Sequence, residues 1–129
     1  MQNENTFYSD PAAEPIPVTV WGTGNMGRAA IRAVEAHPGL RLAAVLTGTT
    51  AKTGRDAGEL AGLDRDLGVP LSTDIEMGLA ALGGSGAVAY TASGDVRPDA
   101  ALTDVRRALA TGAVVVTPAA YAQIGRAYV

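Results

Sequence analysis

The sequence predicts an α/β fold built on a doubly wound parallel sheet, and two observations lead to this prediction. Apolar, β-branched runs alternate with helical patterns five times along the 129 residues. Such alternation requires crossover connections, which put helices on both faces of a parallel sheet. A glycine-rich turn at residues 22–27 joins the first strand to the first helix. We therefore expect a Rossmann-like sheet of about five strands in the order 3-2-1-4-5, with ligands bound where the order reverses.

The composition fits one globular domain and excludes several kinds of site. Apolar residues make up 47% of the chain, which is enough to bury a core. There is no cysteine and only one histidine. Disulfides, thiolate chemistry and a multi-histidine metal centre are thereby excluded, and we predict no metal. The chain has no basic stripe and few aromatic residues, which argues against a nucleic-acid partner.

The N-terminal end differs in character from the rest of the chain. Residues 1–15 are polar, contain Pro11 and Pro15 and show no periodicity. We expect them to form a flexible leader, followed by one domain over residues 16–129. The leader lacks the basic and apolar regions of a signal peptide, and no apolar run reaches the ~18 residues of a membrane span. We expect no membrane partner and a cytoplasmic location.

Hydrophobic periodicity and turn residues predict the elements. Thr73 and Glu76 fit a capping box at a helix start, and Pro98 suits the first turn of the last helix. In chain order we expect strand 16–21, helix 25–37, strand 40–47, loop 48–54, short helix 55–62, a weak strand 69–72, helix 73–82, strand 87–91, helix 98–111 and strand 113–117.

The last of these helices shows an apolar stripe. Leu102, Val105 and Leu109 lie at spacings i, i+3 and i+7 and are predicted to face the core. Asp104 and the two arginines that follow shortly after it are predicted to face solvent.

The glycine turn predicts a binding site for a nucleotide phosphate. Gly22 lets the chain turn sharply off the strand, Gly24 leaves room for a pyrophosphate, and Gly27 lets the helix pack close to the strand. The amides of Gly24, Asn25 and Met26 then lie at a helix N-terminus, which favours an anion. Alternatively, the glycines serve a tight turn that holds no ligand.

The end of the second strand bears on the choice of nucleotide. An NAD site places an acid there for the ribose 2′-hydroxyl, but this chain has no Asp or Glu between Glu35 and Asp56. Thr47 and Lys52 offer a hydroxyl and a cation that suit a 2′-phosphate. We therefore favour NADP(H), with NAD(H) as the alternative. Lys52 and Arg55 are otherwise ordinary solvated loop cations.

Further candidates follow the glycine turn and the fourth strand. Arg28, just past the third glycine, is a second candidate for a phosphate contact, and small residues after the fourth strand leave room beside the nicotinamide ribose. The candidate cofactor-binding residues are Gly22, Thr23, Gly24, Asn25, Met26, Gly27, Arg28, Thr47, Lys52, Thr91, Ala92, Ser93 and Gly94.

The sequence shows no catalytic constellation. There is no defensible Ser/His/Asp grouping and no supported pair of carboxylates, and Tyr90, Tyr121 and Tyr128 have no partner that the sequence identifies. Hydride chemistry would come from the cofactor, and the catalytic residues stay unknown.

Three segments carry a resemblance to a known family: WGTGNMGR at residues 21–28, TGRDAGEL at 53–60 and YTASGDVRP at 90–98. Together they resemble the N-terminal domain of the dihydrodipicolinate reductase-like superfamily, in the branch of 2,4-diaminopentanoate dehydrogenase and native amine dehydrogenase. The resemblance covers about residues 17–121.

The resemblance implies an NAD(P)H-dependent oxidoreductase that reduces C=N or C=O bonds or deaminates amines oxidatively. In that family a C-terminal α+β domain holds the substrate and carries the oligomer contacts, and we expect that domain to be absent from this chain. The chain alone is then expected to bind the dinucleotide weakly and to be inactive. The alternatives are a non-catalytic NADP(H) sensor or partner module, and a domain that binds CoA or a nucleoside.

Overall fold

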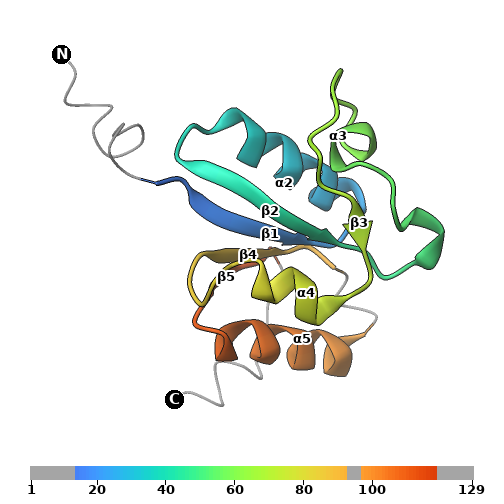
Figure 1. The fold of residues 1–129 in the computed structure, drawn as a ribbon. Coiled ribbons are helices and arrows are strands. Elements are labelled where there is room, and N and C mark those ends of the chain that lie inside the picture. Colours follow the sequence, from blue (N-terminus) through green and yellow to red (C-terminus); the bar gives the residue numbers. More distant parts are fainter. Residues whose placement is uncertain (1–13, 93–96, 119–129) are drawn as a thin grey trace.

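The computed structural model describes residues 14–92 and 97–118. It contains a five-stranded sheet in the order β3-β2-β1-β4-β5, in which every pairing is parallel (Figure 1). The predicted fold class and strand order are therefore confirmed. Most of the predicted leader, residues 1–13, lies outside the described part. The strands are β1 (Ile16–Trp21), β2 (Leu40–Leu46), β3 (Leu71–Ser72), β4 (Ala87–Tyr90) and β5 (Val114–Val116).

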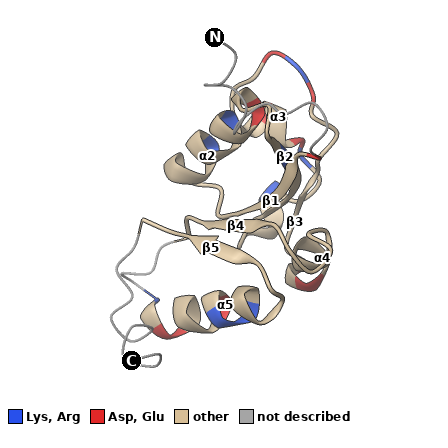
Figure 2. Cartoon of the chain, turned by 90° about the vertical axis from the view of Figure 1, so that its left-hand side faces the viewer, with Lys and Arg blue, Asp and Glu red and all other residues tan. Residues whose placement is uncertain are grey.

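Helices cover both faces of the sheet. In Figure 1, α2 and α3 lie above the sheet, whereas α4 and α5 lie below it. Figure 2 shows that the charged residues belong mostly to the helices and loops, while the strands between them are largely uncharged. None of the described helices is both long and apolar enough to cross a bilayer. The helices are α2 (Asn25–Ala36), the short 3-10 helix η2 (Thr50–Lys52), α3 (Ala57–Leu60), α4 (Ile75–Ala80) and α5 (Pro98–Ala110).

Strand β1 lies at the centre and is buried on both faces. It pairs with β2 on one side and β4 on the other. Successive side chains alternate between the faces. Val18 and Val20 therefore join the core beneath α2 and α3, while Trp21 joins the core over α4 and α5. Thr19 also lies on the second face, where its buried hydroxyl donates to the Gly78 carbonyl at 2.8 Å. This central position fixes the strand's C-terminal end, where the glycine turn begins.

The N-terminus of α4 corrects one prediction. Asp74, rather than Thr73, is the N-cap, and its carboxylate accepts a hydrogen bond from the Met77 amide at 3.1 Å. The Asp74 amide in turn donates to the Ser72 hydroxyl at 3.0 Å. The predicted capping box between Thr73 and Glu76 is therefore wrong, because the carboxylate one residue later satisfies the first turn of the helix.

The buried face of α5 corrects a second prediction. Leu109 is 37% exposed, and Asp104 is buried at 9% relative exposure. The prediction that Leu109 faces the core and Asp104 faces solvent is therefore wrong, although Val105 is buried as expected. The helix presents to the sheet the set Ala101, Asp104, Val105 and Ala108.

Candidate functional site

The turn from β1 into α2 depends on two glycines for packing. Gly22 has a φ of +124°, and a Cβ there would collide with the Thr91 hydroxyl and lie 2.7 Å from the Ala92 amide nitrogen. A Cβ at Gly27 would collide with the Gly22 carbonyl. These two glycines let the first turn of α2 approach the ends of β1 and β4.

Gly24 has a different environment. Its backbone angles, φ −81° and ψ −160°, are open to any residue. A Cβ there would have no atom within 4 Å among the described residues other than its chain neighbours. The fold therefore supplies no packing reason for a glycine at this position.

The amide groups of this turn also leave room for a ligand. Gly24 is the N-cap of α2 and makes no side-chain cap hydrogen bond. Within residues 14–92 and 97–118, the amides of Gly24, Asn25 and Met26 donate to no acceptor. Unpaired N–H groups at a helix start attract an anion. An open position above unpaired amides thus fits a phosphate group, as the sequence predicts.

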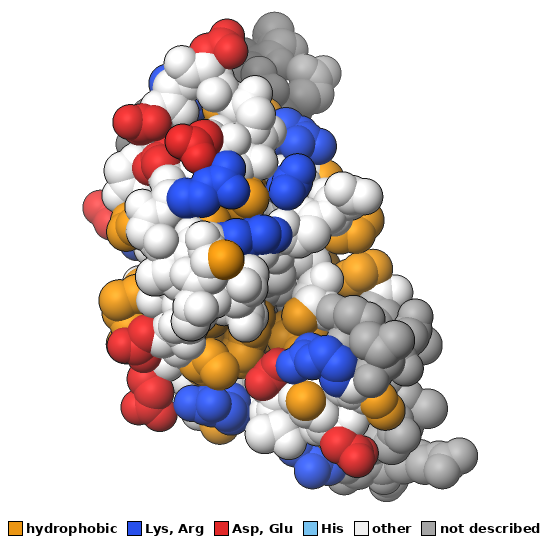
Figure 3. All heavy atoms as spheres, turned by 90° about the vertical axis from the view of Figure 1, so that its right-hand side faces the viewer, with side chains coloured by type: hydrophobic (Ala, Val, Ile, Leu, Met, Phe, Trp, Pro, Cys, Tyr) orange, Lys and Arg blue, Asp and Glu red, His pale blue; other side chains and the backbone are white. Residues whose placement is uncertain are grey.

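A hollow of about 510 Å³ opens beside this turn. It lies where the carboxyl ends of β1 and β4 meet, which is the switch point of the strand order. Figure 3 faces this side of the molecule and shows several Lys and Arg side chains gathered over the upper part of the face. The described residues that line the hollow are Trp21, Gly22, Thr23, Gly24, Gly48, Thr91, Ala92 and Arg97.

On the β2 side, hydroxyls and a cation meet the glycine turn. The buried hydroxyls of Thr23 and Thr47 lie 3.0 Å apart and share a hydrogen bond. The Lys52 ammonium, in η2, donates to the Thr23 carbonyl and hydroxyl oxygens at 3.3 Å each. Arg55 instead pairs with Glu59 at 2.8 Å. The structure therefore brings Thr47 and Lys52 to the glycine turn and engages Arg55 in a surface ion pair.

Arg28 follows Gly27 in the first turn of α2. Its Nε is buried and has no hydrogen-bond partner among the described residues. Leaving a buried N–H donor without an acceptor is unfavourable. This donor is therefore consistent with an acceptor supplied by a ligand.

The β4 side supplies part of the wall. The Thr91 hydroxyl donates to the Trp21 carbonyl at 3.1 Å, and Ala92 lines the hollow beside it. The predicted site residues Ser93 and Gly94 lie outside the described residues. The roles predicted for all these residues in cofactor binding stay predictions.

Beneath this wall lies a polar cluster that sequence reasoning missed. The Tyr90 hydroxyl, at the end of β4, donates to the Asp104 carboxylate of α5 at 2.7 Å. Arg97 donates to the Tyr90 oxygen and to Asp104, each at 3.4 Å. Burial, aided by the adjacent Asp104, raises the pKa of Tyr90 to about 12. Tyr90 lies on β4, 7 and 14 residues before its two partners at α5, so no local pattern indicates the cluster.

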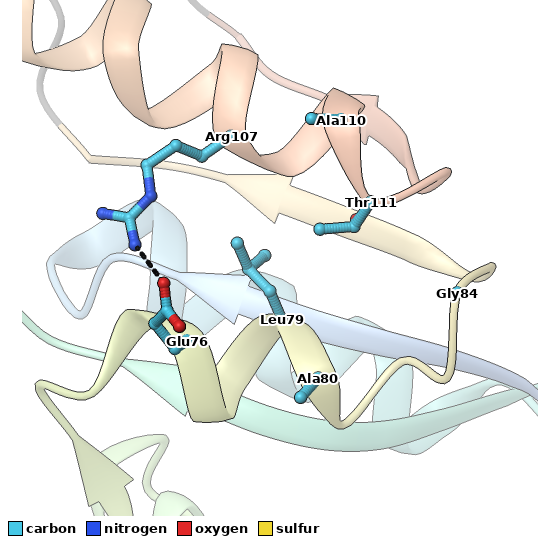
Figure 4. A pocket seen from close by; sticks show the side chains of 7 residues that line it. All are labelled: Glu76, Leu79, Ala80, Gly84, Arg107, Ala110 and Thr111. Atoms are coloured by element: carbon cyan, nitrogen blue, oxygen red, sulfur yellow. Dashed lines mark hydrogen bonds and ion pairs between the residues drawn. The ribbon is translucent and has the colours of Figure 1, made fainter.

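A second hollow, of about 380 Å³, lies between α4 and α5 (Figure 4). The ion pair of Arg107 with Glu76, at 3.3 Å, spans it, and both side chains are well exposed. It lacks the unpaired amides of the glycine turn, and we assign it no chemistry. The lining residues are Glu76, Leu79, Ala80, Gly84, Arg107, Ala110 and Thr111. No group of three His, Asp or Glu side chains among the described residues could hold a metal ion.

Comparison with known proteins supports the same type of domain. The family model described as dihydrodipicolinate reductase, N-terminus, matches residues 16–118. An amine dehydrogenase from Streptomyces virginiae is 63% identical over 106 residues, which cover 82% of this chain and 29% of that protein. A 4-hydroxy-tetrahydrodipicolinate reductase from Nostoc is 38% identical over 100 residues, covering 76% of this chain and 36% of that protein.

The fold comparison agrees with the sequence comparison. The structure of an amine dehydrogenase from Mycobacterium smegmatis superposes with a TM-score of 0.61 at 27% identity, covering 79% of this chain and 29% of that one. The chain thus spans roughly a third of the length of these relatives. Since the family model covers residues 16–118, which is most of the sequence, the chain belongs to the dihydrodipicolinate reductase N-terminal domain family, whose members bind nicotinamide dinucleotides.

Proposed function

We propose that the turn at residues 22–27 holds the diphosphate of NADP(H), and that this domain is the cofactor-binding part of an oxidoreductase acting on C=N or C=O bonds or on amines. The observation that carries the proposal is the open position at Gly24 above unpaired amides. A diphosphate would occupy that space and accept those N–H groups. The buried Nε of Arg28 adds a donor close to the same turn.

The preference for NADP(H) rests on the β2 side of the turn. A 2′-phosphate needs hydroxyls and a cation rather than a carboxylate. Lys52 reaches Thr23 from η2, and the Thr47 hydroxyl is bonded to that of Thr23. No acid lies between Glu35 and Asp56. A 2′-phosphate bound at this edge would therefore lie near the positive charge of Lys52, and residues 36–55 supply no carboxylate that would repel it.

The division of labour in the reaction follows from this arrangement. The bound cofactor supplies hydride transfer at its nicotinamide ring. The residues of this domain bind and orient: the glycine turn fixes the diphosphate, while Thr91 and Ala92 bound the space beside it. Because the chain spans only 29–36% of the length of its relatives, we propose that substrate binding and proton transfer belong to another part of the whole enzyme.

A titration with NADPH tests the binding proposal. Trp21, the sole tryptophan, lines the hollow, and its emission overlaps the absorption of reduced nicotinamide, so bound NADPH should quench it. We expect Gly24→Val to abolish binding, because the side chain fills the space of the diphosphate, while the midpoint of thermal unfolding stays close to that of the unmodified protein.

Ala33→Val, at an exposed position farther along α2, is the matched control and should bind normally. Equal affinity of the unmodified protein and Gly24→Val for NADPH would refute the proposal, and displacement of bound NADPH by CoA would favour a CoA site instead.

The same titration tests the cofactor preference. We expect Lys52→Ala to weaken NADPH binding about tenfold or more and to leave the affinity for NADH unchanged. Arg55→Ala is the control for loss of a nearby charge, and NADH binding as tight as NADPH binding would contradict the preference.

A further inference from the structure

Arg97 carries the only charged side chain among the described residues that line the hollow beside the glycine turn. It stands at the start of α5, as the residue before Pro98. The unpaired amides of the turn lie on the β1 side of the same hollow, and Arg97 lies on the β4 side. A positive side chain therefore faces the space in which an anion would bind.

The position of this guanidinium is fixed from below. Tyr90 is fully buried, with 0% exposure, and Asp104 is buried at 9%. Both contact Arg97 at 3.4 Å, and their own hydrogen bond is 2.7 Å long. The Asp104 carboxylate thus compensates part of the arginine's charge while it restricts the side chain to the wall of the hollow.

The packing around this polar cluster does not explain why polar residues lie here. The neighbouring core between β4 and α5 is apolar and includes Ala101, Val105 and Ala108. Replacing buried ionic groups by apolar ones of similar volume is often neutral or stabilising in such a place. We therefore interpret Tyr90 and Asp104 as residues that position the Arg97 guanidinium rather than as residues that stabilise the core.

We propose that Arg97 binds the diphosphate of the dinucleotide from the β4 side, opposite the amides of the glycine turn, and that Tyr90 and Asp104 are positioning residues for its guanidinium. This inference rests on the proposed function. A guanidinium forms charge-assisted hydrogen bonds to phosphate oxygens in a geometry that suits two acceptors. The diphosphate would then be held between backbone donors on one side and a side-chain donor on the other.

The first test measures the affinity of Arg97→Gln for NADPH and for ADP-ribose, which has the diphosphate and lacks nicotinamide. We expect both affinities to fall by on the order of 10- to 100-fold, with a weaker dependence of binding on salt concentration because one phosphate contact is lost. Arg97→Lys should restore part of the affinity. Arg106→Gln, an exposed change on the same helix, should leave both affinities unchanged.

The second test separates positioning from general stability. Asp104→Asn should weaken NADPH binding in the unmodified protein and have little further effect in Arg97→Gln, because it acts through the arginine. An equal loss in both backgrounds would show that Asp104 acts only on the fold. Tyr90→Phe should follow the same pattern with a smaller loss.

The outcomes for this inference differ from those for the proposed function. If the unmodified protein binds NADPH and Gly24→Val does not, the glycine-turn site stands. Unchanged affinity of Arg97→Gln for both ligands would then overturn only the role of Arg97. A loss for NADPH without a loss for ADP-ribose would also overturn it, because the contact would be with the nicotinamide or the 2′-phosphate, both of which ADP-ribose lacks, and not with the diphosphate.

Discussion

The three motif glycines at the end of β1 are present for different physical reasons. A Cβ at Gly22 or Gly27 would collide with the protein itself, whereas one at Gly24 would project into open space. The G-x-G-x-x-G pattern predicts the turn but gives all three glycines equal weight. Only the structure separates the two that the fold needs from the one that a ligand would need.

A change at Gly27 should therefore be a change in stability. Gly27→Ala places a Cβ against the Gly22 carbonyl, which backbone movement alone can relieve. We expect the free energy of unfolding to fall by at least about 2 kcal/mol, as measured by urea denaturation. Gly24→Ala is the matched control and should stay within about 1 kcal/mol of the unmodified protein. Equal stability of the two variants would contradict the packing argument.

At this scale the sequence predicts residue types well and their partners poorly. The sequence predicts small residues at the glycine turn and a hydroxyl at Thr47, and the structure brings the Thr47 hydroxyl within 3.0 Å of that of Thr23 in the turn. Asp104 was predicted to face solvent because an acid on a helix usually does. Its burial depends on the Tyr90 hydroxyl from another element, and a helical pattern contains no information about such a partner.

Among the elements, the segment between α3 and β3 depends on one side chain. The Asp56 carboxylate accepts hydrogen bonds from four amides, those of Gly58, Leu67 and Gly68 at 2.8 Å each and that of Val69 at 3.1 Å. It also serves as the N-cap of α3. Alternating charges at residues 63–68 gave no sign of this order, since the amides that bind Asp56 have no signature in the sequence.

This arrangement predicts a dependence of stability on pH. Burial raises the pKa of Asp56, but the hydrogen bonds from four backbone N–H groups together lower it by more than burial raises it. The pKa in the folded state therefore lies below the usual 3.8. The stabilisation is therefore fully present above the pKa of the unfolded chain, near 3.8, and is lost as the pH falls through the lowered value of the folded state.

We expect Asp56→Asn to lower the free energy of unfolding near neutral pH and to speed hydrogen exchange at the amides of Leu67, Gly68 and Val69. The difference from the unmodified protein should vanish in acid below the folded pKa. Asp64→Asn, an exposed acid in the same segment, is the control and should show no such effect. A pH-independent difference would mean that the charge of Asp56 is not what orders the segment.

The predicted boundaries of the elements are close where turn residues are strong and less accurate elsewhere. β1 has the predicted bounds, and α2 ends one residue early. β3 is shorter than predicted, and Pro70 instead forms an isolated bridge to Asp56. The stripe chosen for α5 followed the large apolar residues, but the side of a helix that packs close to a sheet here uses alanines.

For the molecule as a whole, the alternation of elements predicts the parallel sheet with helices on both faces, and the glycine turn after the first strand favours the Rossmann-like strand order. Right-handed crossovers leave little choice once the strands are identified. The sequence did not indicate the exposure of the last strand. Val114 and Val116 are each 63% exposed on β5, which lies at the edge of the sheet.

Exposed apolar side chains on an edge strand favour association between molecules. The double change Val114→Thr and Val116→Thr keeps the β-branched shape and removes apolar surface. We expect less self-association at high protein concentration by light scattering, and a free energy of unfolding within about 0.5 kcal/mol of the original value. Leu109→Gln, a change at an exposed position on α5, is the comparison. An equal reduction in self-association by that variant would mean that β5 is not the surface responsible.

The contrast between Gly24 and the other two motif glycines, Gly22 and Gly27, has a consequence for how this domain can evolve. A copy of this gene that acquires a larger residue at Gly24 would still yield a well-folded, abundant protein, because nothing within the described chain needs that space. Quality control in the cell would not detect the lesion. Under the proposed role of Gly24, one such substitution would leave this domain folded and unable to bind its cofactor, and a survey that scores only expression or solubility would count it as intact.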